Sequence, residues 1–154
     1  MKRTFFISIL PASTVERDSP LAFTIWVDLA QPGVAADVQI FRRGLDRYLE
    51  SYGMTRTLNP LHALICSPER SLTLNDQINL LVWMIEDRRA LGVEIGALQL
   101  HTGIPSQRDR VAQLPAMFED QALVPMASLY KAGRLYAEQV VEMLGGYHAP
   151  VALH

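Results

Sequence analysis

Hydrophobic residues alternate with polar ones, or run together, in four short segments, and this pattern predicts four β-strands. In the clearest segment Phe23, Ile25 and Val27 share one face, as in a half-buried strand. Turn and breaker residues separate the first two segments, which we therefore expect to pair as neighbouring antiparallel strands of a hairpin. The four expected strands cover residues 4–10, 21–29, 61–67 and 93–101.

Two amphipathic helices are predicted between these strands, because hydrophobic residues there recur every three or four positions. The first covers residues 34–52 and stops at Gly53. The second begins after Thr73, which forms a Thr-x-x-Asp start signal with Asp76, and it ends at Gly92. Its apolar surface is wider than one contact needs, so we expect it to lie between the sheet and another element.

The last third of the chain is predicted to be mainly helical. It opens with a polar stretch, residues 101–114, which we interpret as a hinge or a functional loop with a short helix starting at Ser106. A long helix then extends from Pro125 to the glycine pair Gly145 and Gly146.

These elements predict a single α+β domain over residues 1–146. Its expected architecture is a mixed, mainly antiparallel four-stranded sheet with helices packed on one face and a C-terminal helical extension. Residues 1–101 would form the sheet and two helices, residues 102–146 the extension, and residues 147–154 a flexible tail.

Composition narrows the class of function. Hydrophobic residues make up 49% of the 154, which is enough for a sizeable core. Charged residues make up only 19%, which favours an apolar surface that a protein partner or a second copy covers. The net charge of −2 gives no strong nucleic-acid signal. The longest uninterrupted apolar run, residues 80–85, is too short to span a membrane, and we interpret the apolar start, residues 4–10, as a strand rather than a secretory signal.

Catalytic and metal chemistry is weakly indicated. Cys66 is the only cysteine, so no intrachain disulfide can form and a cytoplasmic location is the default. A thiol-dependent enzyme would need a base, and His101 is the candidate because His62 lies about 13 Å away along the same strand. A buried structural thiol is the favoured interpretation. No spacing suits a metal site and no phosphate-binding loop is present, so no metal or cofactor is expected.

Arginines are the candidate binding residues. One group lies on the outer side of the first predicted helix, and a second would gather if three loops shared one end of the sheet, where it would bind phosphate, carboxylate or an acidic partner. Scattered solvated arginines are the alternative. The candidates are Arg42, Arg43, Arg47, Arg56, Arg70, Arg108 and Arg110.

Amphipathic aromatic residues either fill the core or anchor an interface. Core is the default for those on a helical stripe, but the surplus apolar width of the second helix and the extra C-terminal helix favour an interface. These residues are Trp26, Tyr48, Tyr52, Trp83, Tyr130 and Tyr136.

Residues 21–100 resemble the YggL family of small bacterial ribosome-associated proteins. The resemblance rests on Leu21-Ala22-Phe23 at the start of a strand, on Leu64-Ile65-Cys66, and on a helix with Trp83 followed by acidic residues and arginines. It implies an α+β sandwich without catalytic residues, although this chain lacks a very basic N-terminal segment and continues beyond the last strand.

We therefore expect a non-enzymatic cytosolic protein of bacterial or mobile-element origin that binds another macromolecule and regulates or inhibits it. The expected partner is a protein or a ribonucleoprotein, and a homo-oligomer is an alternative. The competing hypotheses are a ribosome-associated protein of YggL type and a small thiol-dependent enzyme that uses Cys66 and His101.

Overall fold

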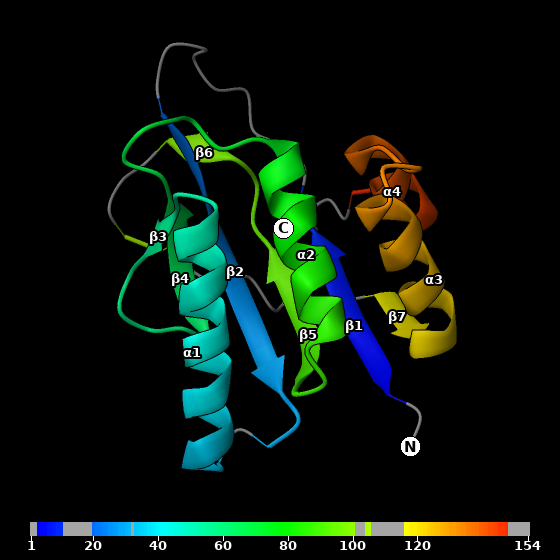
Figure 1. Ribbon diagram of the computed structural model, residues 1–154, viewed down its shortest axis with the longest axis horizontal. Coiled ribbons are helices and arrows are strands. Elements are labelled where there is room, and N and C mark those ends of the chain that lie inside the picture. The colour runs from blue at the N-terminus through cyan, green and yellow to red at the C-terminus, as the bar shows by residue number, and fades with distance from the viewer. Residues whose placement is uncertain (1–2, 11–19, 32, 101–103, 106–115, 148–154) are drawn as a thin grey trace, which may run out of the picture.

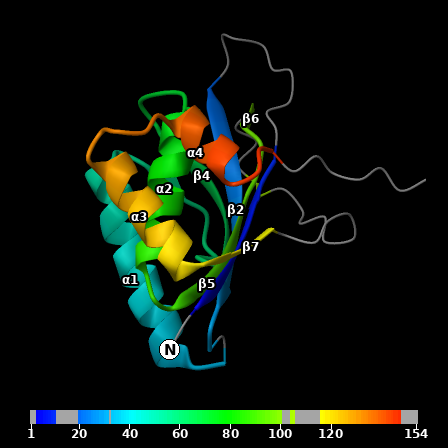
Figure 2. The same ribbon diagram turned by 90° about the vertical axis from the view of Figure 1, so that its right-hand side faces the viewer.

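A layer of helices packs on one face of a mixed sheet (Figures 1 and 2). This arrangement comes from a computed structural model, which describes residues 3–10, 20–31, 33–100, 104–105 and 116–147. The strands are β1 (Thr4–Ile9), β2 (Leu21–Leu29), β3 (Thr55–Arg56), β4 (His62–Cys66), β5 (Ala90–Ile95), β6 (Gln99–Leu100) and β7 (Ala116–Glu119). The helices are α1 (Ala35–Ser51), α2 (Leu74–Glu86), α3 (Asp120–Lys131) and α4 (Ala137–Met143).

The α+β class and the mixed sheet agree with the prediction, but the sheet has seven strands rather than four. Its order is β3-β4-β2-β5-β1-β7, with β6 paired to β2. Within the described ranges β1 and β5 are parallel and the other pairs antiparallel. Strands β3 and β6 have two residues each, too few to show a period, and β7 lies in the stretch that was expected to be helical.

The predicted hairpin of the first two strands is wrong, because β5 lies between β1 and β2. A hairpin loop usually has about 2–5 residues, whereas the connection from Leu10 to Pro20 is long enough to pass over a neighbouring strand. The register places Phe6 beside Gly92 and Ile25 beside Ile95. Strand β5 is therefore an inner strand of the sheet, between β2 and β1.

The first two helices form where the pattern predicts them. Thr73 and Asp76 make the expected reciprocal cap of α2, with the Thr73 N–H donating to the Asp76 carboxylate at 2.8 Å. The helix ends at Glu86, so the expected stop at Gly92 is wrong. Gly92 lies inside β5, where a Cβ atom would stand 2.9 Å from the Cβ atom of Phe6 on β1. The glycine thus allows two strands to approach, rather than ending a helix.

The predicted long C-terminal helix is two helices. Helix α3 begins at Asp120, ahead of the expected start at Pro125, and ends where Gly133 adopts a φ of 76°. Helix α4 follows after a short turn and stops at Gly145, as expected. Most of the predicted polar hinge, residues 101–114, and the predicted tail, apart from Tyr147, lie outside the described residues.

Helix α2 is the central helix of the layer and is buried along most of its length. It packs on β5 on one side and against α3 and α4 on another, as its wide apolar surface predicts (Figure 1). Residues from β1 to α4 contribute to one hydrophobic core, in which Phe5, Phe23 and Phe41 are fully buried. Within the described ranges, no helix is both long and apolar enough to cross a lipid bilayer.

Candidate functional site

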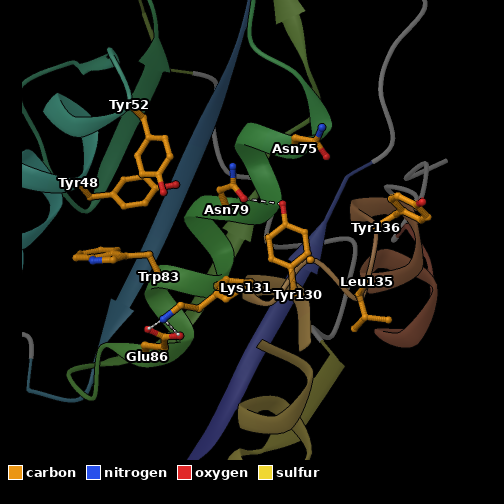
Figure 3. Close-up of a pocket in the computed structure, with 12 residues that line it drawn as sticks. Tyr48, Tyr52, Asn75, Asn79, Trp83, Glu86, Tyr130, Lys131, Leu135 and Tyr136 are labelled. Carbon is orange, nitrogen blue, oxygen red and sulfur yellow. Dashed lines mark hydrogen bonds and ion pairs between the residues drawn. The ribbon is translucent and has the colours of Figure 1, made fainter. Parts of the chain in front are cut away.

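A cleft of about 700 Å³ opens on the helical layer, on the side away from the sheet. Its walls come from α1, α2 and the segment from α3 to the start of α4, which are far apart in the sequence (Figure 3). Five aromatic side chains line it, namely Tyr48, Tyr52, Trp83, Tyr130 and Tyr136. The cleft therefore gathers five of the six aromatic residues that the sequence singles out, while Trp26 lies on the sheet.

Three of these rings form one continuous wall. The ring centroid of Tyr48 lies 4.7 Å from that of Tyr52 and 5.6 Å from that of Trp83. Trp83 also packs 5.8 Å from Phe41 in the core. On α1, Gly44 lies against the Trp83 ring, and a Cβ atom there would lie only 3.1 Å from that ring. The wall thus extends from the core at Trp83 to the half-exposed Tyr52 at the surface.

The opposite wall of the cleft, which includes Tyr130 of α3, is joined by a hydrogen bond to α2, which forms the floor. The Tyr130 hydroxyl donates to Asn79 Oδ1 at 2.6 Å, which ties α3 to α2 (Figure 3). Tyr136, at the start of α4, is 75% exposed and stands at the outer rim. The cleft is therefore open between two aromatic sides, with the carboxamide of Asn79 on its floor.

The charged groups at one end of the cleft neutralise each other. Lys131 Nζ lies 3.0 Å from a Glu86 carboxylate oxygen (Figure 3). Both side chains are exposed, so this ion pair adds well under about 1 kcal/mol to stability. Its consequence is electrostatic: the lining carries no net charge.

Tyr48 carries an unusual hydroxyl. Its oxygen is inaccessible to solvent and has no hydrogen-bond partner among the described residues. Burial raises the pKa of Tyr48 well above the usual range of tyrosine, and the adjacent Tyr52 adds to the shift. At neutral pH the hydroxyl therefore keeps its proton and remains a buried donor without an acceptor among the described residues.

We expect Tyr48→Phe to raise the free energy of unfolding by about 1 kcal/mol, because it removes a buried polar group that forms no hydrogen bond. Urea denaturation would measure this change. Tyr52→Phe is the matched control. Because Tyr52 is 47% exposed, removal of its hydroxyl should change the free energy of unfolding little. A Tyr48→Phe protein less stable than wild type would show that the hydroxyl is satisfied.

The predicted arginine sites divide into three groups. Arg56 and Arg70 are held by carboxylates of this chain, Asp46 at 2.7 Å and Asp76 at 2.7 Å. Both guanidinium groups are thus already engaged. Arg108 and Arg110 lie outside the described residues, so their expected approach to the other two stays a prediction. The third group is Arg42, Arg43 and Arg47, which are exposed along α1.

The thiol hypothesis receives no catalytic geometry from the described residues. Cys66 is half-buried, and its Sγ lies 3.3 Å from the Thr55 hydroxyl oxygen. His62 stacks on Trp26, with ring centroids 5.3 Å apart. His101, the proposed base, lies outside the described residues. Among the residues that the structure describes, no three His, Cys, Asp or Glu side chains gather as metal ligands.

Sequence reasoning missed the polar lining residues Asn75, Asn79, Glu86 and Lys131. A signal for three of them exists. Asn75, Asn79 and Glu86 recur at helical spacing with Trp83, and together they form the polar edge of α2 that borders the cleft. This edge is hard to distinguish from an ordinary solvated face when the positions of α1 and α3 are unknown.

Comparison of the chain with protein-family models, with curated proteins and with solved structures gives no match. The geometry of the cleft is therefore the basis for the function proposed below.

Proposed function

We propose that this protein binds a segment of another protein in the cleft between α1, α2 and α3, and so regulates or inhibits that partner. The partner is a protein, free or within a ribonucleoprotein, and the single cysteine favours an encounter in the cytoplasm. The observation that carries the proposal is the continuous wall of Tyr48, Tyr52 and Trp83, which faces an open cleft.

Tyrosine and tryptophan support a protein-binding role for a physical reason. They bury a large area at a small cost in conformational entropy, and they dominate the energetics of protein interfaces. Here the ring of Trp83 packs against Phe41 in the core, so fixing this side chain on binding costs little conformational entropy.

The test is affinity capture with matched variants. We expect Tyr52→Ala/Tyr136→Ala to retain at least about tenfold less partner than wild type, because truncation of such anchors costs more than about 1 kcal/mol each. Both side chains are well exposed, so the variant keeps its fold. Partners would be captured from a lysate of the native host, identified by mass spectrometry, and then titrated as purified proteins against both forms.

The matched control is Leu58→Ala/Met117→Ala, which removes two exposed hydrophobic side chains that do not line the cleft. This control should capture the partner as wild type does. Equal capture by the cleft variant and wild type would refute the proposal. Salt-sensitive capture of ribosomal subunits that ignores the cleft variant would instead favour the ribosome-associated alternative.

A further inference from the structure

We infer that the segment bound in the cleft is acidic, and that its carboxylates pair with Arg43 and Arg47 on α1, beside the aromatic wall. This inference rests on the proposed function and names the charge of the partner segment. Two observations carry it. The arginines of α1 have no carboxylate partner among the described residues, and helical geometry places two of them next to the part of α1 that contacts Trp83.

The exposed surface of α1 carries a surplus of positive charge. The helix contains as many carboxylates as arginines, and its arginines are Arg42, Arg43 and Arg47. Two of the carboxylates are held by arginines of other elements, because Asp46 lies 2.7 Å from Arg56 and Asp37 lies 3.8 Å from Arg89. Of the carboxylates of α1, Glu50 alone remains to oppose the three arginines, and it forms no ion pair with them.

This lack of partners distinguishes the arginines of α1 from most other arginines in the described ranges. Those that pair with a carboxylate of this chain are Arg3, Arg56, Arg70, Arg88 and Arg89. Arg43 and Arg47 instead lie one turn apart on the same helix, where like charges repel and disfavour the helix. An acidic ligand would replace this repulsion with attraction at both positions.

Helical geometry places Arg47 at the edge of the aromatic wall. A Cβ atom at Gly44 would lie 3.1 Å from the Trp83 ring, so this side of α1 faces α2. Arg47 follows Gly44 by three positions, which puts it about 60° around the helix from that contact and on its exposed side. Arg43 lies one turn before Arg47 and is also exposed. The two guanidinium groups therefore extend the aromatic wall along the outer surface of α1.

The composition of this surface fits a segment that carries both apolar and acidic side chains. Tryptophan, tyrosine and arginine are the residue types that most often dominate the binding energy of protein interfaces. The wall of Tyr48, Tyr52 and Trp83 suits an apolar side chain, and a planar guanidinium group binds a carboxylate through two parallel hydrogen bonds. Glu86, one turn after Trp83, does not cancel the positive charge of α1, because Lys131 lies 3.0 Å from it.

A nucleic acid is the competing ligand, because its phosphates pair with arginine and its bases stack on aromatic rings. Its binding draws on a positive field over many phosphates, whereas this chain has a net charge of −2. A protein segment with a few carboxylates needs only the local surplus on α1. The observations therefore favour the acidic protein segment, and RNA becomes one arm of the experiment.

The experiment selects ligands without presupposing their charge. A phage-displayed library of random dodecapeptides would be passed over the immobilised full chain, and the enriched peptides would be synthesised, labelled with fluorescein and titrated by fluorescence anisotropy. We expect Asp and Glu to be enriched over the unselected library together with apolar residues, and we expect binding to weaken as the salt concentration rises. A labelled oligouridine is the nucleic-acid comparison.

Two single charge reversals on the same helix locate the contact. Arg47→Glu should weaken binding of the selected peptides by at least about fivefold, because it replaces an attraction with a repulsion. Arg42→Glu is the matched control, since it changes the net charge equally but lies about 200° around α1 from Gly44. It should weaken binding by less than about twofold, because salt screens the more distant charge. Circular dichroism would establish that each variant is folded.

Any of four results would overturn the inference: no peptide is enriched, the enriched peptides lack carboxylates, oligouridine binds more tightly than they do, or the two reversals weaken binding equally. These failures are distinguishable from failure of the proposed function. If capture of the partner depends on Tyr52 and Tyr136 but is unchanged in Arg47→Glu, the cleft is a protein-binding site for a segment that is not acidic. Capture that ignores Tyr52 and Tyr136 would refute the proposed function itself.

Discussion

Replacement of Arg3 with leucine is expected to lower the free energy of unfolding by about 3–5 kcal/mol, the range seen when one partner of a buried ion pair is removed. The Arg3 side chain is only 7% exposed and lies 2.9 Å from the Asp120 carboxylate. It also donates to the backbone carbonyls of Asp87 at 2.6 Å and Ala90 at 2.9 Å, and to that of Ile85. Leucine would remove all of these hydrogen bonds at once, although the Asp87 carbonyl would keep the Ala90 N–H as a donor at 3.2 Å.

The position of these acceptors explains the size of the effect. Ile85 and Asp87 lie at the C-terminal end of α2, where the last carbonyls have no partner within the helix. Arg3 satisfies them from the start of β1 and at the same time holds Asp120, the first residue of α3. One side chain thus connects the sheet, the central helix and the C-terminal helices, and its loss is expected to weaken all three contacts together.

Urea denaturation of wild type and Arg3→Leu would measure this loss. Arg88→Leu is the matched control, because Arg88 approaches the same Asp120 carboxylate from the solvent side, at 4.0 Å with 78% of its side chain exposed. The control should change stability by less than about 1 kcal/mol. Comparable losses in the two variants would show that Arg3 acts only as a surface charge.

Arg3 also shows where prediction from the sequence stops. At the N-terminal edge of an apolar run it has the appearance of a solvated flanking charge, and its acceptors are 82 to 117 positions away. The parallel pairing of β1 with β5 and the antiparallel pairing of β1 with β7 bring them together. These pairings were missed because periodicity identifies a strand and its buried face but carries no information about which strand becomes its neighbour.

Local signals, by contrast, were sufficient for the helices and for part of the site. The reciprocal cap at Thr73 and Asp76 was predictable because both residues act within one turn of chain. Helical spacing likewise identifies the aromatic residues along each helix. It does not identify the cleft that they share, because that cleft depends on how the helices pack. Tyr48, Trp83 and Tyr130 meet only through the packing of α1 and α3 against α2.

The second large effect is expected at Asp76, where Asp76→Asn should lower the free energy of unfolding by about 2–3 kcal/mol. The Asp76 side chain is 8% exposed, and its carboxylate accepts hydrogen bonds from both terminal nitrogens of Arg70, at 2.7 and 2.8 Å. It also accepts the Thr73 N–H that caps α2. Asparagine keeps the size but cancels the charge and one acceptor, so it loses charge-assisted hydrogen bonds worth about 1.5–3 kcal/mol.

The test is to measure the free energy of unfolding of wild type and Asp76→Asn by denaturation between pH 7 and pH 3. Burial alone would raise the pKa of Asp76, but the hydrogen bonds from Arg70 and Thr73 outweigh it and hold the pKa below the usual value of 3.8. The stability that the charged form adds is therefore complete above that value and is lost as the pH falls through the lowered pKa of the folded protein. Asp76→Asn lacks this titration, so the difference between the two proteins should shrink toward acid pH.

The control for this experiment is Asp46→Asn, at the more exposed pair that Asp46 forms with Arg56. It should change stability by less than about 1 kcal/mol, because an exposed carboxylate gains little from its partner. A difference between wild type and Asp76→Asn that stays constant with pH would mean that the amide disturbs the cap itself and that the charge at Asp76 adds nothing.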